Sequence, residues 1–138
     1  MNQYLKQYQK NEVETASPEK ILILLYDGAI QFLNKAKIAM EQKNIPEIHN
    51  NLIGCENIIL EFINTVDIEN GGDFAVRIKA LYEYFYSTLV QANMKKDVTK
   101  IDEVLKHLVE LRATWKQAIA MANSQKEVSA SQSSEFEG

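Results

Sequence analysis

The sequence predicts an all-α protein, an up-and-down antiparallel four-helix bundle with a short N-terminal helical segment. Only two prolines and five glycines occur in 138 residues, and 46% of the residues are hydrophobic, which suffices for one buried core. Between the breaks, apolar residues recur at intervals of three and four, as on one face of a helix. Helices with one apolar face each and short connections pack most simply as a bundle.

The first long helix is expected to begin at about Pro18 and to end at about Lys43. Ser17 can accept a hydrogen bond from a free amide at the helix start, and proline suits the first helical position. Asn44-Ile45-Pro46 ends this helix, because a residue before proline avoids the helical conformation. The same proline can open the second helix.

Turn residues and caps mark the remaining helices. The second helix is expected to run to about Val66, and Gly71-Gly72-Asp73 then supplies the turn and the cap of the third. The third helix runs to about Lys95, and Asp97 or Thr99 caps the fourth.

The chain divides into three expected segments. Residues 1–16 form a mobile segment that docks on the bundle, because its apolar spacing is helical but it is too short to hold a helix alone. Residues 17–123 form the four-helix bundle. Residues 124–138 are Ser-rich and weakly apolar, and are expected to be a disordered tail.

Charge and hydropathy exclude several classes of partner. The net charge is −4, and the basic residues are interleaved with acidic ones, which makes nucleic acid a poor partner. No apolar run is long enough to insert into a membrane, and no secretion signal is recognisable, so a cytosolic protein is expected. The lone cysteine, Cys55, is interpreted as a small buried hydrophobe in a reducing compartment.

The predicted helices carry more apolar surface than a simple bundle can bury. With Ile21, Leu25, Ala29, Phe32, Leu33 and Ala36 in the core, other apolar residues of the first helix fall on two further sides. The surplus residues along the chain are Ile23, Leu24, Ile30, Ile53, Leu60, Tyr84 and Tyr86. Such strips usually mark a groove for a partner, most simply an amphipathic helix. The alternative is that the apolar faces are merely wide and that the N-terminal segment covers the rest.

No catalytic or metal-binding pattern is recognisable, and no cofactor is expected. A metal site in a bundle would need Glu-x-x-His pairs, whereas Glu103 and His107 are four residues apart and His49 is the only other histidine. A histidine-phosphotransfer bundle is a remote alternative, since neither histidine has the lysine and small residues that would settle a phosphoryl group.

The order of short motifs along residues 4–120 resembles the flagellin-specific export chaperone family, the FliS type. Each motif is weak alone, but their order and spacing are specific. They are Tyr8-Gln9-Lys10-Asn11-Glu12-Val13-Glu14-Thr15-Ala16-Ser17-Pro18, Leu25-Tyr26-Asp27-Gly28-Ala29-Ile30, Glu69-Asn70-Gly71-Gly72-Asp73, Leu81-Tyr82-Glu83-Tyr84, Gln91-Ala92-Asn93 and Trp115.

This resemblance implies a non-enzymatic chaperone of the cytosol. Such a protein holds the C-terminal segment of flagellin in a one-to-one complex, prevents premature polymerisation, and presents flagellin to the membrane export gate of the flagellar type III apparatus. Whether a co-chaperone assists is left open. The competing interpretation is a bundle adaptor for another amphipathic partner.

The resemblance also implies roles for individual residues. Those of the N-terminal segment, expected to form a displaceable cover and part of the surface shown to the export gate, are Tyr4, Leu5, Tyr8 and Val13. Those that match family positions within the bundle, and are candidates for contact with flagellin, are Tyr26, Asp27, Tyr82 and Asn93. The alternative for each of the latter is a structural role at the edge of the core or at a helix end.

Overall fold

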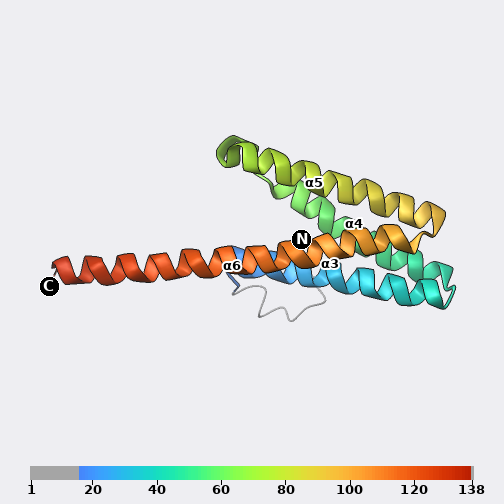
Figure 1. Cartoon of the computed structure of the whole chain (residues 1–138), viewed down its shortest axis with the longest axis horizontal. Coiled ribbons are helices and arrows are strands. Elements are labelled where there is room, and N and C mark those ends of the chain that lie inside the picture. Colours follow the sequence, from blue (N-terminus) through green and yellow to red (C-terminus); the bar gives the residue numbers. More distant parts are fainter. Residues whose placement is uncertain (1–15, 138) are drawn as a thin grey trace.

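The described residues form four α-helices. The computed structural model describes the backbone of residues 16–137 and the side chains of residues 16–131. The helices are α3 (Pro18–Glu41), α4 (Ile45–Thr65), α5 (Ile68–Lys95) and α6 (Val98–Glu137) (Figure 1). Each of α3 and α5 packs against both α4 and α6. The predicted all-α antiparallel four-helix architecture is therefore confirmed for this part of the chain.

The cap of α3 follows the sequence prediction, and α4 begins at the predicted break with proline in its first turn. The Ser17 hydroxyl accepts a hydrogen bond from the Lys20 amide at 3.2 Å, with proline in the first turn of α3. The side-chain oxygen of Asn44 accepts one from the Glu47 amide at 3.3 Å and starts α4. α3 ends at Glu41, slightly before the predicted end.

The connection from α4 to α5 combines a cap at Asp67 with a break at Gly72. Asp67 caps α5, because its carboxylate accepts a hydrogen bond from the Asn70 amide at 3.2 Å. Gly72, with φ 59° and ψ −143°, then breaks the helical geometry inside α5. The predicted break at Gly71-Gly72-Asp73 is thus found, because two helical segments meet across a kink at Gly72. Only the cap differs from the prediction, since Asp67 caps the first of these segments about one turn upstream.

The last helix begins as predicted but extends further. Asp97 accepts hydrogen bonds from the amide and the hydroxyl of Thr99, at 3.0 and 2.6 Å. α6 continues to Glu137, past the end expected at residue 123, and no glycine or proline interrupts residues 124–137. Residues 120–131 are all exposed, and Figure 1 shows this end of α6 projecting alone beyond the bundle. The division of the chain into three segments, including disorder of residues 124–138 in solution, stays a prediction.

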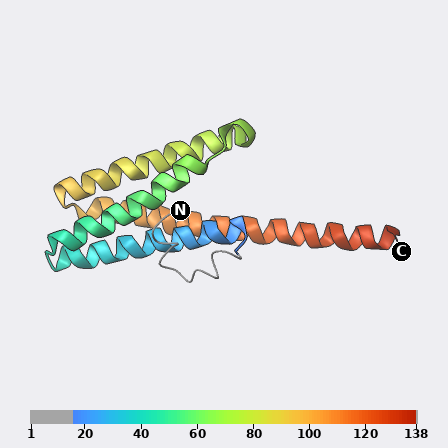
Figure 2. The same ribbon diagram turned by 180° about the vertical axis from the view of Figure 1, so that it is seen from behind.

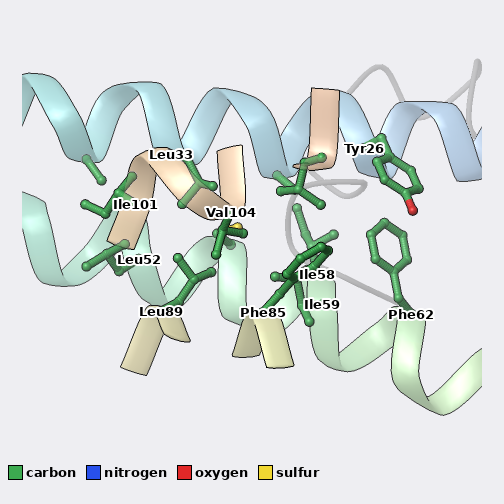
Figure 3. Close-up of a cluster of buried hydrophobic side chains, with 14 of the residues drawn as sticks. Tyr26, Leu33, Leu52, Ile58, Ile59, Phe62, Phe85, Leu89, Ile101 and Val104 are labelled. Carbon is green, nitrogen blue, oxygen red and sulfur yellow. The ribbon is translucent and has the colours of Figure 1, made fainter. Parts of the chain in front are cut away.

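The core lies along the inner faces of the four helices. Figure 3 shows side chains of α3, α4, α5 and α6 meeting there. The largest fully buried ones are Tyr26, Phe62, Phe85, Leu33, Ile48, Leu52, Ile58, Ile59, Leu89, Ile101, Leu108 and Val104. The assignment for the first helix needs one change: Ile21 and Phe32 are half-buried, whereas Leu24 and Tyr26 are buried.

The bundle is closed at one end and open at the other. In Figures 1 and 2 the α5–α6 turn lies beside the α3–α4 turn, while the N-terminal end of α5 stands away from the pair formed by α3 and α6. Among the described residues, no helix has the combination of length and apolar character that crossing a membrane requires.

Candidate partner-binding site

A pocket of about 220 Å³ occupies the open end of the bundle, and it is called the end pocket below. All four helices and the α4–α5 turn contribute to it. Its lining residues are Leu22, Phe62, Thr65, Val66, Asp67, Phe74, Ala75, Ile78, Tyr82 and Trp115. The pocket exists because α5 diverges from α3 and α6 here, which leaves apolar side chains without a neighbouring helix to cover them.

A chain of hydrogen bonds links three helices at the base of the end pocket. The hydroxyl oxygens of Tyr26 and Tyr82 are 2.6 Å apart, and the indole Nε1 of Trp115 donates to the Tyr26 hydroxyl at 3.0 Å. The Phe62 ring stacks on Tyr26 with centroids 4.8 Å apart (Figure 3). Burial raises the pKa of both tyrosines, so their hydroxyls stay neutral and can keep donating hydrogen bonds.

The rim of the end pocket is aromatic and exposed. Phe74 is 62% exposed and meets the ring of Trp115 edge to face, with centroids 6.0 Å apart. A large apolar side chain this exposed, at the edge of an apolar pocket, suits a contact with another polypeptide. Helical periodicity does not single out Phe74, although its position directly after the Gly-Gly-Asp motif is a usable signal.

A second apolar surface lies on α4. Ile53 and Leu60 are 38% and 37% exposed, two helical turns apart, and are called the α4 strip below. Their expected exposure is thus found in the structure, while their contact with a partner stays a prediction.

Comparison with known proteins identifies the family. The family model described as "Flagellar protein FliS" matches residues 1–122. The flagellar secretion chaperone FliS of Bacillus subtilis is 37% identical over 112 residues, which cover 81% of this chain and 83% of the relative. The corresponding protein of Salmonella typhimurium is 32% identical over 117 residues, covering 84% and 87%. The chain belongs to the FliS family. It is therefore a chaperone and not an enzyme.

A further relative, the flagellar secretion chaperone FliSB of Pseudomonas aeruginosa, is 37% identical over 116 residues, covering 80% of this chain and 91% of the relative. Membership in the FliS family confirms the resemblance seen in the sequence. It favours the chaperone over both the general adaptor and the histidine-phosphotransfer bundle. The residues beyond 122, which include the projecting end of α6, lie outside the match to the FliS family model.

Three of the residues expected to contact a partner are buried instead. Leu24 is 9% exposed, Tyr26 is 0% exposed and Tyr82 is 3% exposed. In the free chain they belong to the core, because the core face of α3 is wider than one stripe and reaches both Leu24 and Tyr26. Their direct contact with a partner stays a prediction. Tyr82 still reaches the end pocket with part of its side chain. Gly28 of α3 is also buried.

Other candidates are held by neighbouring helices. Asp27 forms an ion pair with Arg112 of α6. Tyr84 is half exposed and donates a hydrogen bond to the Glu103 carboxylate at 2.5 Å. The side-chain amide of Asn93 is 2.9 Å from His49 Nδ1 and joins α5 to α4. These contacts support the structural alternative for each side chain.

The remaining candidates are half-buried or undescribed. Ile30 packs against the core, and Tyr86 does the same from α5. Ile23 borders a shallow hollow between the start of α3 and residues Lys116 and Ile119 of α6. The candidates that lie outside the described residues are Tyr4, Leu5, Tyr8 and Val13.

Metal ligands do not gather among the described residues. No group of three or more of their His, Cys, Asp or Glu side chains is placed so that it could hold a metal ion. Cys55 is fully buried, and burial raises the pKa of its thiol, which keeps it protonated and unreactive. His107 is half-buried and stacks on Phe85 with centroids 5.6 Å apart.

Proposed function

We propose that this chaperone binds the C-terminal segment of flagellin in a one-to-one complex and keeps it from polymerising before export. The observation that carries the proposal is the end pocket in a member of the FliS family, with a rim formed by the exposed Phe74 and the half-buried Trp115. An amphipathic helix of the partner would insert apolar side chains into the end pocket and lie along the α4 strip.

The energetics suit a cargo that must be released. A disordered segment that folds on binding buries on the order of 1,000–3,000 Å², while its ordering subtracts roughly 2–5 kcal/mol from the interaction. Such a complex is specific because several apolar side chains must fit, yet it dissociates without covalent chemistry. A chaperone that delivers its cargo needs both properties.

The test is a titration with a peptide of the flagellin C-terminal segment. Trp115 is the only tryptophan of the chain and lines the end pocket, so its fluorescence reports occupancy directly. A one-to-one endpoint with a gain in helical circular dichroism is expected. The absence of both a fluorescence change and a gain in helicity at high peptide concentration would refute the proposal.

A matched pair of variants localises the contact. Phe74→Ala removes the exposed rim side chain and should weaken binding, whereas Val76→Ala on the same helix, 50% exposed and outside the pocket lining, should not. Equal affinities for the two variants would place the partner elsewhere on the molecule.

A second part of the proposal concerns how the chaperone delivers flagellin to the export gate. Residues 1–16 are proposed to cover apolar surface in the free chaperone and to contact the export-gate membrane protein once flagellin has displaced them. Deleting residues 1–14 should raise the binding of a hydrophobic dye and change flagellin affinity. It should also abolish capture by the purified cytosolic domain of the gate protein. If the deletion variant is still captured by the gate protein, the surface that the gate recognises lies on the helices of the bundle.

A further inference from the structure

Glu56 of α4 is a buried carboxyl group without a neutralising partner. It is only 4% exposed, and among residues 16–131 its Oε2 atom has no hydrogen-bond partner. Neither of the ion pairs formed by described side chains includes it. Since an unpaired carboxylate is costly to bury, desolvation raises the pKa of Glu56 to about 7.

The position of Glu56 follows from the register of α4 against α5. His49 and Asn93 hydrogen-bond across this pair of antiparallel helices. Glu56 lies two turns along α4 from His49 and on the same face, and Tyr86 lies two turns back along α5 from Asn93. Glu56 is therefore placed on the side of α4 that packs against α5, level with Tyr86.

Few titratable groups lie near this level on the helices that pack against α4. On α5 they are Tyr82, Tyr86 and, further along, Lys79 and Glu83; on α3 they are Tyr26, Asp27 and Lys35; on α4 itself they are His49, Cys55 and Glu61. Asp27 is already paired with Arg112 of α6. Desolvation is accordingly the one cause of the raised pKa of Glu56, with no charged neighbour contributing.

Glu56 lies between a fixed end and an open end of the α4–α5 pair. The His49–Asn93 hydrogen bond joins the helices about 10 Å away along α4 on one side. Phe62, which lines the end pocket, lies about 9 Å away on the other side. Any widening of the end pocket by movement of α5 away from α4 would bring water toward this carboxyl group.

We propose that Glu56 is a proton-linked switch of the end pocket: its carboxyl group is neutral while α4 and α5 are packed, and it ionises when they separate to admit a partner. This inference rests on the proposed function for the identity of the partner. One proton leaves Glu56 for solvent when the helices separate, and one proton returns to it when they repack.

The sign of the pH dependence follows from this linkage. The packed form binds the proton up to pH about 7, whereas the separated form loses it near the ordinary glutamate value of 4.5. Raising the pH from 6 to 8 therefore favours the separated form by about tenfold. Above that range both forms are ionised and the dependence ends.

Amide hydrogen exchange of the free chaperone tests the switch without any partner. After correction for the intrinsic pH dependence of exchange, protection in residues 52–62 of α4 and 75–89 of α5 should fall about tenfold between pH 6 and 8. Glu56→Gln and Glu56→Met should each abolish this change. Glu61→Gln, the same substitution at a half-exposed position of α4, should retain it. A wild-type pH dependence in both Glu56 variants would overturn the inference.

The flagellin peptide supplies the second test. Its affinity should be about tenfold higher at pH 8 than at pH 6 for the wild-type chain and equal at both for Glu56→Gln. A peptide that fails to bind at either pH contradicts the proposed function. In that case the exchange measurement alone tests whether Glu56 controls the separation of α4 and α5. Binding that ignores pH, together with pH-dependent exchange, would overturn the link between Glu56 and the end pocket.

Discussion

The hydroxyl groups of Tyr26 and Tyr82 lie 2.6 Å apart beneath the end pocket, which ties α3 to α5 at the level where the bundle begins to open. Trp115 of α6 donates to the same Tyr26 hydroxyl. The Tyr26 hydroxyl oxygen thus joins α3, α5 and α6 beside the end pocket.

Removal of the Tyr26 hydroxyl is the first prediction. Tyr26→Phe should lower the free energy of unfolding by about 1–3 kcal/mol, because the buried Tyr82 hydroxyl and the Trp115 indole would both lose a partner. Tyr82→Phe should cost less, since Trp115 keeps its acceptor. Urea unfolding followed by tryptophan fluorescence measures both, with the half-buried Tyr86→Phe as the control. Equal costs for the Tyr26 and Tyr82 variants would contradict this account.

A close approach of α3 and α4 gives the second prediction. A Cβ atom at Gly54 would lie 2.7 Å from the ring of Phe32, so Gly54→Ala should destabilise the bundle by about 1–3 kcal/mol despite the better helix propensity of alanine. Adding Phe32→Leu should recover part of the loss. Thermal unfolding of the two single variants and the double variant gives the coupling, and additive effects would show that the ring moves aside freely.

Helix boundaries were largely predictable, because Pro18, Pro46 and Asp97 favour helix starts through their own backbone and side-chain properties, which can be read from the sequence. The break at Gly72 was predictable from the glycine pair, whereas the short helical turn before it was not, because it depends on the hydrogen bond from the Asn70 amide to Asp67. The burial of Tyr26 was not predictable from helical periodicity, since periodicity gives the direction of a core face but not its width. The end pocket arises from the divergence of whole helices, which no local pattern encodes.

The cap of α5 gives a pH-dependent prediction. Hydrogen bonds from the side chain and the amide of Asn70 lower the pKa of Asp67. The ionised cap therefore contributes stability that is present above the ordinary value of 3.8 and is lost as the pH falls through the lowered pKa. Asp67→Asn can still cap the helix but does not titrate. Its melting temperature should depend less on pH below 4 than that of the wild-type chain, and an identical acid profile would assign this loss to other carboxylates.

The projecting end of α6 gives a prediction about stability. Residues 120–131 are exposed along their whole length, so they bury little apolar surface. A chain ended after Asn123 should melt within about 1 °C of the full chain and should bind the flagellin peptide equally well. A large loss of stability would show that the helix is held by contacts beyond the described side chains.

The α4 strip gives the last prediction, because it tests whether partner binding extends beyond the end pocket. Ile53→Ser combined with Leu60→Ser removes apolar side chains that are already more than a third exposed, so the fold should lose little stability. Affinity for the flagellin peptide should fall by about tenfold, since full burial of such a side chain contributes roughly 1.5–3 kcal/mol and a little over a third of each remains to be buried. Val109→Ser, at a half-exposed position of α6, is the matched control and should bind as the wild-type chain does. If the strip variant binds normally while Phe74→Ala does not, the partner occupies the end pocket alone.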